Sequence, residues 1–485
     1  MSAWRSPSGS RSLQSEAPLP PEDGSWSLLP QPVRQLGDDL VDLADGLLTN
    51  RLRLAVTGLR RSGKTVLITS LVHHLIDGHD LPFLKVAHDG RYRGARVHPG
   101  RQGTTFPYAA FAEQLAAPQP TWPEATERLS SLRLEIAYAA GSGLWRHLDP
   151  ASRLYLDVID YPGEWLLDLP LLERDYARFS AETLQRAVRP IRALAARAWL
   201  ARISALPADA PADPELAAEL ARLFTDYLRR CQRELGLSLI QPGRFLSPGE
   251  HAQSPLLAWS PLPDGPAPRG SLRALMRERY DAYRQEIVEP FWREHFSRFD
   301  RQIVLVDLFN PLNRGPEHLL DTQEALALIL ESFRYGAGSW WRRLVRPRID
   351  RLLFAASKAD HVAPSQHPAL KQLLERLIAP AARRPRFEGV PYEVMALAAL
   401  RCTDVVKTEH DGQVLSCVRG RLKDEARETV LFPGEVPADL PEAEDWTSGR
   451  FRFREFAPRR LVPGGVGQHL RLDQALEYLL GDHLR

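Results

Sequence analysis

The stretch "TGLRRSGKTVLITSLVHHL", Thr57–Leu75, contains a glycine, four further residues and then Gly-Lys-Thr. Gly58, Gly63, Lys64 and Thr65 therefore meet the pattern G-x-x-x-x-G-K-[ST] of a phosphate-binding loop. In such a loop the glycines let the backbone close around phosphate groups, and successive N–H groups point at them from a helix N-terminus. The pattern predicts that Lys64 neutralises β- and γ-phosphate charge and that Thr65 ligates Mg²⁺ through its hydroxyl.

The residues around this motif supply the context that it requires. "RLRLAVTG" before it indicates a buried strand, and the apolar residues after it lie close to helical spacing. Arg61, Ser62 and Val66 join the predicted nucleotide-binding set because they lie in the loop or at the start of the helix. The alternative is an ordinary glycine turn with a solvated lysine.

The composition bounds the class of protein. A chain of 485 residues exceeds one ordinary core, which predicts two or three folding units. The 63 basic and 61 acidic residues give a net charge of +2. This balance argues against nucleic acid as the main partner, because binding a phosphate backbone needs a strong positive field. Cys231, Cys402 and Cys417 are far apart and odd in number, which indicates a reducing compartment and no disulfide framework.

The start of the chain and its hydropathy bear on localisation. Residues 1–30 are rich in Ser, Pro and Gly, are predicted to be disordered and lack the apolar core of a secretory signal. No run of about 18 or more apolar residues is present, so no transmembrane segment is predicted. We therefore expect a soluble, cytoplasmic protein. The histidines show no spacing suited to zinc, and His88, Asp89 and His98 are predicted to be solvated.

Six apolar runs are predicted to be strands separated by helical stretches. This order favours an α/β fold with a mainly parallel sheet flanked by helices. The alternation in "SLRLEIAY" indicates that this strand lies at an edge or runs antiparallel. The runs are 51–58, 131–138, 152–160, 301–309, 350–360 and 391–400.

Two insertions interrupt this pattern. One carries long helical patterns broken by Pro-rich connectors, and the other carries short strand patterns that include "GRFRFREF" at 449–456. An amphipathic lead helix is predicted at 32–50, after the tail. The predicted organisation is a tail at 1–30, a nucleotide-binding domain at 31–168 and 301–405, a helical insertion at 169–300, a strand-rich insertion at 406–465 and a closing helix at 466–485.

A second motif follows the strand at 152–160. "YLDVIDYPGEW" has the form D-x-x-G, with Asp160 and Gly163 at its ends. Asp160 is predicted to serve the Mg²⁺ site by holding a water on the ion, and the Gly163 N–H to meet a γ-phosphate. The segment that follows would move when that phosphate leaves. Asp157 is a rival acid, but strand alternation points it to the other face. The alternative is that Asp160 only initiates a Pro-Gly turn.

A third motif selects the base. "LLFAASKADHV" contains Ser357, Lys358 and Asp360 in the order of the guanine signature [N/T]-K-x-D, with Ser at its first place. The Asp360 carboxylate could accept hydrogen bonds from guanine N1–H and the 2-amino group, and adenine lacks both donors. The Ser357 hydroxyl is expected to tie this loop to the phosphate loop, and His361 is included in the predicted binding set. The alternative is a solvated lysine and a helix-capping aspartate.

These motifs, in this order, resemble the YcjX family of bacterial Ras-like P-loop GTPases. The resemblance implies GTP or GDP with Mg²⁺, a helical insert after D-x-x-G, a stress-associated role and a companion inner-membrane protein, and it leaves out residues 1–30. The similar stretches are "LRLAVTGLRRSGKT", "DYPGEWLLDLPLLERDY", "IQPGRF", "RFDRQIVLVDLFNPLN", "LLFAASKADHV", "FPGEVPADLP" and "RLDQALEYLLGDHLR".

The catalytic candidates are less well defined. A switch-I threonine should ligate Mg²⁺ and contact the γ-phosphate, and Thr126 fits this place, with Thr104 and Thr105 as rivals. Ras-type enzymes place a glutamine directly after D-x-x-G, where this chain has Glu164. An ionised glutamate cannot donate to a phosphoryl oxygen, so either Glu164 does not position the water or intrinsic turnover is slow. Arg60 and Arg61 could add positive charge in cis, but solvated side chains are the simpler expectation.

Two further stretches allow two readings each. The apolar residues between Trp165 and Leu171 predict either a surface that docks a partner or the helical insert in one nucleotide state, or constant core packing. "SWWRRLVRPRIDR" at 339–351 predicts either contact with an anionic membrane surface or inward tryptophans beside solvated arginines.

The sequence as a whole predicts a GTP-binding switch protein with slow or partner-stimulated GTP hydrolysis, located in the cytoplasm and peripheral to the inner membrane through a partner. One rival is an ATP-dependent, kinase-like P-loop enzyme with the helical insertion as a lid. The other is a non-catalytic scaffold that nucleotide stabilises.

Overall fold

The computed structural model describes residues 50–59, 61–98, 104–124, 128–140, 152–207, 209–252, 254–333, 349–382, 391–410 and 412–485. Five sequence predictions lie wholly or mainly outside these residues. They are the tail at 1–30, the lead helix at 32–50, Arg60, Thr126 and most of the segment 339–351. The described residues from Asn50 onward fall in a single compact unit.

Seven strands of the described chain form one sheet in the order β2-β3-β4-β1-β5-β6-β7. From β4 to β7 neighbouring strands pair in parallel, whereas β2, β3 and β4 pair antiparallel. The strands are β1 (Arg51–Gly58), β2 (Tyr92–His98), β3 (Ser130–Tyr138), β4 (Ser152–Asp160), β5 (Arg301–Val306), β6 (Arg351–Ala356) and β7 (Tyr392–Ala396). All six predicted strands are confirmed. The strand β3 is antiparallel, but β2, which was not predicted, takes the edge beside it.

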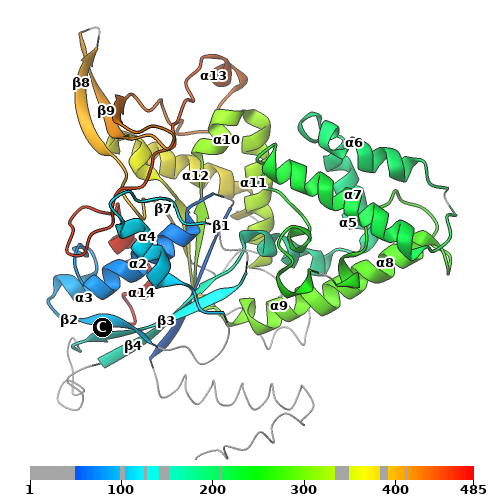
Figure 1. Cartoon of the computed structure of the whole chain (residues 1–485), viewed down its shortest axis with the longest axis horizontal. Helices are drawn as coiled ribbons and strands as arrows, with labels where there is room; N and C mark the ends of the chain where they lie inside the picture. The colour runs from blue at the N-terminus through cyan, green and yellow to red at the C-terminus, as the bar shows by residue number, and fades with distance from the viewer. Residues whose placement is uncertain are drawn as a thin grey trace, which may run out of the picture. The chain divides into compact units, whose positions relative to one another are not determined.

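Helices cover both faces of this sheet (Figure 1). In β5, Ile303 and Leu305 pack in a hydrophobic cluster with α2 (Lys64–Asp77) and α14 (Leu472–Leu480). Val304 and Val306 of the same strand pack in the other cluster, with α11 (Pro316–Ser332) and α12 (His367–Ala382). Because successive side chains of a strand point to opposite faces, a strand covered on both faces must be apolar throughout. This explains why the central strands are nearly continuous apolar runs.

The helices near the sheet follow from local sequence. α14 confirms the predicted closing helix, and α2 confirms the helix after the phosphate-binding motif. The helices are α2 (Lys64–Asp77), α3 (Lys85–His88), α4 (Tyr108–Ala116), α10 (Phe309–Arg314), α11 (Pro316–Ser332), α12 (His367–Ala382), α13 (Ala443–Thr447) and α14 (Leu472–Leu480).

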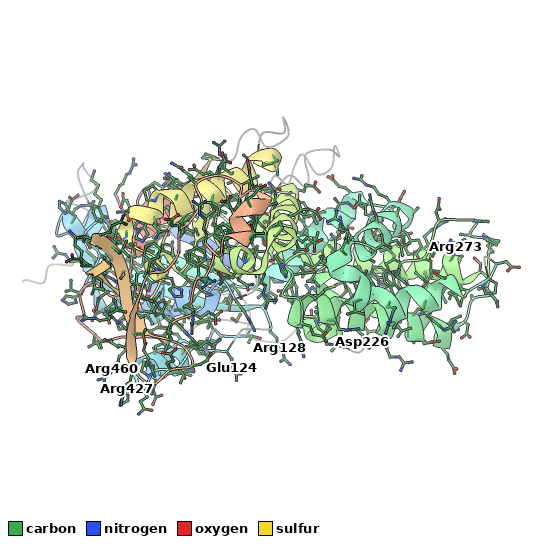
Figure 2. The ribbon with its side chains drawn as sticks, turned by 90° about the horizontal axis from the view of Figure 1, so that it is seen from above. Glu124, Arg128, Asp226, Arg273, Arg427 and Arg460 are labelled. Carbon is green, nitrogen blue, oxygen red and sulfur yellow. The ribbon has the colours of Figure 1, made fainter. Side chains whose placement is uncertain are left out.

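In the described residues, five more α-helices lie between β4 and β5, and the side chains before them explain where three begin. The Asp175 side chain accepts from the Arg178 N–H, Asp213 accepts from Glu215 and Leu216, and Ser271 caps its helix in the same way. The polar faces are solvated, as Asp226 shows on α7 (Figure 2). These helices are α5 (Tyr176–Ala187), α6 (Pro190–Ser204), α7 (Pro214–Arg233), α8 (Leu272–Tyr283) and α9 (Glu289–Glu294).

This helical segment shares its core with the sheet. One cluster of buried apolar residues runs from Trp199 and Phe224 in the helices to Val304 and Phe354 in the strands. The predicted boundaries of a separate helical subdomain therefore stay a prediction.

Near the C-terminus, three strands form a second, antiparallel sheet in the order β10-β9-β8. They are β8 (Asp404–His410), β9 (Gln413–Arg421) and β10 (Glu428–Leu431). The strand predicted at 449–456 is wrong, since only Phe456 forms a bridge there, with Leu422. The backbone N–H and C=O of Phe453 bond the side chain of Asn313 in α10 instead. Within the described residues, no helix is both long and apolar enough to cross a membrane.

Candidate nucleotide-binding site

The phosphate-binding motif lies between the end of β1 and the start of α2. Gly63 precedes the helix with φ at 87°, a left-handed conformation that glycine adopts without steric cost. The first N–H groups of an α-helix have no partner within the helix and form a favourable site for anions. Arg61, also at positive φ, and the buried Ser62 complete the turn.

Gly58 is required by a close approach. A Cβ atom there would lie 2.2 Å from the Ser62 hydroxyl oxygen and 2.9 Å from the Leu305 carbonyl oxygen. The Leu59 N–H also donates to the same carbonyl over 3.1 Å. The start of the loop therefore packs directly against β5, and a side chain at Gly58 would force the loop to move away from that strand.

Lys64 and Asp160 meet at the carboxyl ends of β1 and β4. The ammonium group of Lys64 forms an ion pair with the Asp160 carboxylate, and both side chains are largely buried. Thr65, beside Lys64, is buried as well, whereas Val66 packs among apolar side chains from α4 and the chain after β7. The sequence prediction that Lys64, Thr65 and Asp160 converge agrees with this geometry.

The rival acid has a structural role. The Asp157 carboxylate accepts hydrogen bonds from Arg51 over 2.8 Å and from Arg133 over 2.5 Å. Both arginines come from the strands on either side of β4. Asp157 thus cross-links three strands away from the phosphate loop.

Gly163 lies directly against the phosphate loop. A Cβ atom on Gly163 would lie 2.1 Å from the carbonyl oxygen of Gly58. The D-x-x-G turn and the phosphate loop therefore touch through two glycines, backbone to backbone. This contact places the Gly163 backbone within the same small region as Lys64 and Asp160.

The predicted base-binding loop follows β6. The Ser357 hydroxyl donates to the carbonyl oxygen of Val306 over 3.3 Å, so it ties the loop to β5. The sequence had predicted a tie to the phosphate loop instead. Lys358 has φ at 60°, and its ammonium group donates to Asp307 over 2.7 Å. Burial opposes the charge on Lys358, but the Asp307 carboxylate outweighs it and raises the pKa of the lysine.

Asp360 has one carboxylate oxygen available. Its Oδ2 atom accepts from the Cys402 N–H over 2.6 Å. Its Oδ1 atom is buried and has no hydrogen-bond partner among the described residues. A buried acceptor of this kind is costly unless a donor meets it. An N–H donor on a bound base would satisfy it.

His361 has a packing environment. Its ring stacks on Phe309 with centroids 6.0 Å apart, and Phe456 meets it edge-on. Burial lowers the pKa of His361 to about 4, so the imidazole is neutral near pH 7. Its predicted contact with nucleotide stays a prediction.

Two parts of this site belong to no sequence motif. Asp307, at the end of β5, holds Lys358, and its Oδ1 atom accepts from the Phe309 N–H over 3.0 Å. The loop 397–403, after β7, receives the Ala359 N–H at Leu397, and its Cys402 and Thr403 contact Asp360. In the sequence, both could be found only from their place directly after predicted strands, because parallel strands end at the same edge of the sheet.

The switch-I candidates are only partly described. Thr126 lies outside the described residues. Thr104 and Thr105 are exposed and lie beside the start of β3, where the Ser131 N–H donates to the Thr104 carbonyl. The choice between Thr126 and its rivals stays a prediction.

Comparison with known proteins agrees with this geometry. A model of the YcjX-like family, DUF463, matches residues 52–484. The chain belongs to the YcjX-like family. The protein of Escherichia coli (strain K12) named Ras-like GTPase YcjX is 40% identical over 468 residues, which cover 93% of this chain and 100% of that relative. The protein of the same name from Shewanella oneidensis (strain MR-1) is 39% identical over 461 residues, covering 89% and 94%.

The fold class predicted from the sequence is confirmed. The mostly parallel sheet with helices on both faces is the α/β arrangement of a Ras-like P-loop protein. In this family member the three motifs follow β1, β4 and β6, which are close neighbours in the sheet.

The segment after D-x-x-G is a long 3₁₀ helix, η3 (Gly163–Glu173), and it is almost wholly buried. The Glu164 side chain accepts from Gln232 of α7 over 2.9 Å. The guanidinium of Arg244 stacks on the Trp165 ring at 3.3 Å from its centroid. This apolar stretch therefore packs against the helical segment, and whether the packing is constant or changes with nucleotide state stays a prediction.

A buried carboxylate fixes the middle of η3. Asp168 accepts from the N–H groups of Gly243 and Arg244 over 2.7 and 3.0 Å, and from the Tyr283 hydroxyl over 2.7 Å. Burial raises the pKa of Asp168 to about 6 despite these hydrogen bonds. Any movement of η3 must therefore break or carry along these contacts.

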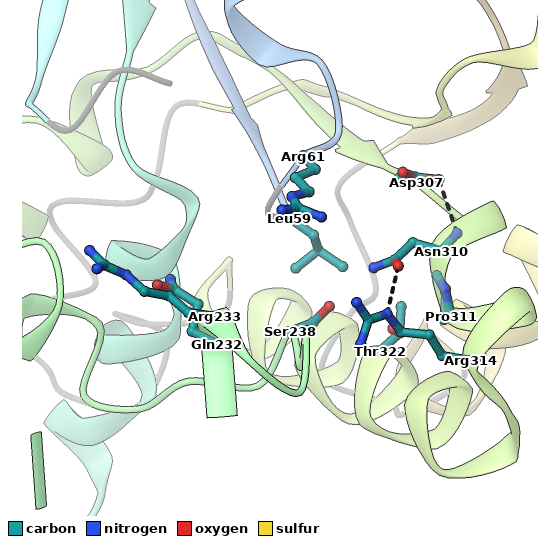
Figure 3. Close-up of a pocket in the computed structure, with 11 residues that line it drawn as sticks. Leu59, Arg61, Gln232, Arg233, Ser238, Asp307, Asn310, Pro311, Arg314 and Thr322 are labelled. Atoms are coloured by element: carbon teal, nitrogen blue, oxygen red, sulfur yellow. Dashed lines mark hydrogen bonds between the residues drawn. The ribbon is translucent and has the colours of Figure 1, made fainter. Parts of the chain in front are cut away.

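A pocket opens beside the phosphate loop, between that loop, the end of α7, α10 and α11 (Figure 3). Asn310 lies at the start of α10, where its N–H donates to Asp307 and its side chain accepts from Arg314, one turn later. The helical segment thus reaches the nucleotide site. The lining residues are Leu59, Arg61, Gln232, Arg233, Gly236, Ser238, Asp307, Asn310, Pro311, Arg314 and Thr322.

Proposed function

We propose that this chain binds GTP with Mg²⁺ and hydrolyses it to GDP and phosphate, as a nucleotide-dependent switch. The observation that carries the proposal is the convergence of three motifs at one edge of the sheet. Lys64 pairs with Asp160, Gly163 touches Gly58, and Asp360 has a buried oxygen that no described residue meets with a donor. The printed names of the two relatives, Ras-like GTPase, agree with it.

Phosphate binding would use charge and backbone together. In the proposal, Lys64 turns from Asp160 to the β- and γ-phosphates, while the N–H groups of Gly63 and the first turn of α2 surround them. Oxygen ligands suit Mg²⁺, and Thr65, Asp160 and Thr126 are the proposed contributors. The ion, when bound, would neutralise charge on the phosphates.

Base selection would rest on Asp360. Its Oδ1 atom would accept one donor of guanine, and Oδ2 would share a second with the Cys402 N–H. Adenine has a ring nitrogen acceptor in place of N1–H, so it would face the carboxylate unfavourably. Lys358, held by Asp307, would lay its aliphatic stem over the base.

Hydrolysis is proposed to be slow without a partner. Glu164 occupies the place after D-x-x-G, and its hydrogen bond with Gln232 turns its carboxylate toward α7. A carboxylate there would add negative charge near a transition state that already carries it. A partner that supplied a cation could therefore raise the rate strongly; an arginine finger contributes ~10³–10⁵-fold.

The switch would act through η3. When the γ-phosphate leaves, Gly163 would lose a contact, and η3 would be free to shift. Because Asp168 and Trp165 of η3 contact the helical segment, the shift would be passed on to that segment. The family resemblance adds a stress-associated role and peripheral attachment to the inner membrane through a protein partner. It also supports the proposed division into a nucleotide-binding domain and two insertions.

Competition titrations on the unmodified chain test this proposal. We expect GTP and GDP to displace a fluorescent guanine nucleotide in the presence of Mg²⁺, and ATP to fail at matched concentrations. Release of phosphate from GTP should be measurable and slow. Equal competition by ATP would favour the kinase-like rival, and tight GTP binding without any phosphate release would favour the scaffold.

A further inference from the structure

Three potential metal ligands meet at the C-terminal end of α2, away from the nucleotide motifs. His74 lies in the last turn of α2, Asp80 in the turn that follows, and His469 in the segment before α14. One ligand atom from each lies within 4.8 Å of the other two. His469 Nε2 and Asp80 Oδ2 are 3.7 Å apart.

His74 is the central observation. Its side chain is completely buried, and neither ring nitrogen has a hydrogen-bond partner in the part of the chain that the structure describes. Burial, with the neighbouring His469 and His73, lowers the pKa of His74 to about 4. Near pH 7 the ring is therefore neutral and offers a lone pair, which is what a metal ion needs.

The other two side chains are held in position beside it. Asp80 lies at positive φ, and its Oδ2 atom accepts from the Gln468 N–H over 3.1 Å. His469 Nε2 lies 2.6 Å from the carbonyl oxygen of Asp80. The rings of His74 and His469 meet edge-on with centroids 4.8 Å apart. The three groups thus form one cluster and not three separate exposed side chains.

We propose that His74, Asp80 and His469 bind a divalent transition-metal ion of the zinc class, with water as a fourth ligand. Two imidazoles and a carboxylate are a donor set that zinc accepts, and an oxygen-seeking ion such as Mg²⁺ would avoid it. Tetrahedral bonds of ~2.0–2.2 Å bring ligand atoms to about 3.4 Å from one another. The widest separation must therefore close by about 1.4 Å, within the range of side-chain rotation.

Binding exchanges existing contacts. His469 Nε2 would give up its hydrogen bond to the Asp80 carbonyl, and the Leu472 N–H would lose His469 Nδ1 as an acceptor. The proton on His469 would move from Nε2 to Nδ1, which frees the Nε2 lone pair for the ion and keeps one proton on the ring. With three protein ligands, the site is weaker than a closed site with four.

The ion would join two distant parts of the chain. Asp80 and His469 are 389 residues apart, and α2 is the helix that begins at Lys64. The Gly464 N–H already donates to Asp77 over 2.8 Å at the same end of α2. The proposed ion strengthens this link between the phosphate-loop helix and the C-terminal segment.

Zinc titration of the full chain tests the site. The chain is stripped with a chelator and titrated with Zn²⁺ against a chromophoric competitor, with excess Mg²⁺ to fill any oxygen-lined site. We expect about one equivalent of Zn²⁺ on the unmodified chain and at least about tenfold weaker binding for His74→Gln and Asp80→Asn. His79→Gln, a histidine in the same turn with an exposed side chain, is the matched control and should bind as the parent does.

Two results would overturn the proposal. One is an unmodified chain that binds no Zn²⁺, and the other is an affinity that neither substitution changes. If His74→Gln lowers the thermal midpoint, the test rests on Asp80→Asn. That substitution keeps the size of the side chain, and Asp80 is less buried than His74. Co²⁺ gives an independent readout, since its tetrahedral visible absorption should appear with the parent and be lost in Asp80→Asn. None of these measurements depends on nucleotide.

Discussion

At the scale of single residues, the candidate site depends on two glycines that leave no room for a side chain and on one buried carboxylate oxygen. Gly58 and Gly163 touch through their backbones, and a Cβ on either would overlap a neighbouring atom. Asp360 leaves one buried oxygen for a ligand. Substitutions at these places should therefore alter nucleotide binding more than folding.

Asp360→Asn should exchange the preferred base. The amide presents an N–H where guanine N1–H and the 2-amino group need an acceptor. Hydrogen bonds to charged groups contribute ~1.5–3 kcal/mol each, so GTP affinity should fall at least about tenfold. Xanthine has a carbonyl in place of the 2-amino group, so xanthosine triphosphate should gain affinity. Competition titrations of GTP, XTP and ATP check this, and unchanged GTP binding would remove Asp360 from the site.

Gly163→Ala should weaken the binding of a GTP analogue more than the binding of GDP. The added methyl group would lie 2.1 Å from the Gly58 carbonyl oxygen, so the D-x-x-G turn must move away from the phosphate loop. We expect at least about tenfold weaker binding of a non-hydrolysable GTP analogue and a smaller loss for GDP, because only the former has a γ-phosphate. Calorimetric titrations measure both. Equal losses for the two nucleotides would show that Gly163 acts on the loop alone.

At the scale of elements, sequence patterns predicted the strands well because buried parallel strands are apolar throughout. They failed for β2, whose "YRGARVH" is partly exposed and polar. They failed in the opposite sense at 449–456, where alternating Phe and Arg indicate a strand but Asn313 takes the backbone hydrogen bonds.

The candidate site also contains residues that the sequence predicted and residues that it did not. Lys64, Asp160 and Asp360 were predictable because each belongs to a short motif with fixed spacing. Asp307 and the loop 397–403 were not, since they reach Lys358 and Asp360 only through the arrangement of the sheet. The cluster of His74, Asp80 and His469 was invisible for the same reason, although the histidines were inspected for zinc spacing.

The helix η3 should change with nucleotide state. It begins at Gly163 and is fixed at Asp168 to the segment around Gly243. With a GTP analogue we expect slower amide exchange at 163–172 than with GDP, because the γ-phosphate would hold the first turn. The region 121–130, near the switch-I candidates, should respond with it. Identical exchange in both states would favour the scaffold rival.

At the scale of the whole molecule, buried histidines make the fold sensitive to acid. Burial lowers the pKa values of His74, His295 and His361 to about 4. Unfolded histidines protonate near pH 6.5, so the unfolded chain binds more protons between about pH 6.5 and 4. Stability is therefore lost as the pH falls through this window.

One group acts in the opposite direction. The raised pKa of Asp168 means that the folded chain binds the extra proton between about pH 4 and 6, which favours folding as the pH falls. Three histidines against one aspartate leave a net loss. The thermal midpoint, measured with a chelator present, should be clearly lower at about pH 5 than at pH 7.5. An equal or higher midpoint at the lower pH would contradict the assignment of neutral histidines.

The position of β1 at the middle of the sheet has a consequence for synthesis. The Arg53 N–H at the β1 edge is bonded by the Asp300 carboxylate, 247 residues later, just before β5 begins. At ~5–20 residues per second, a ribosome needs roughly 12–50 s to make that stretch. Throughout this interval one edge of β1 leaves its backbone N–H and C=O groups unpaired, although the phosphate loop has already emerged. A nascent chain released before β5 cannot complete the sheet, so it would be a substrate for chaperones and proteases and not a nucleotide-binding fragment.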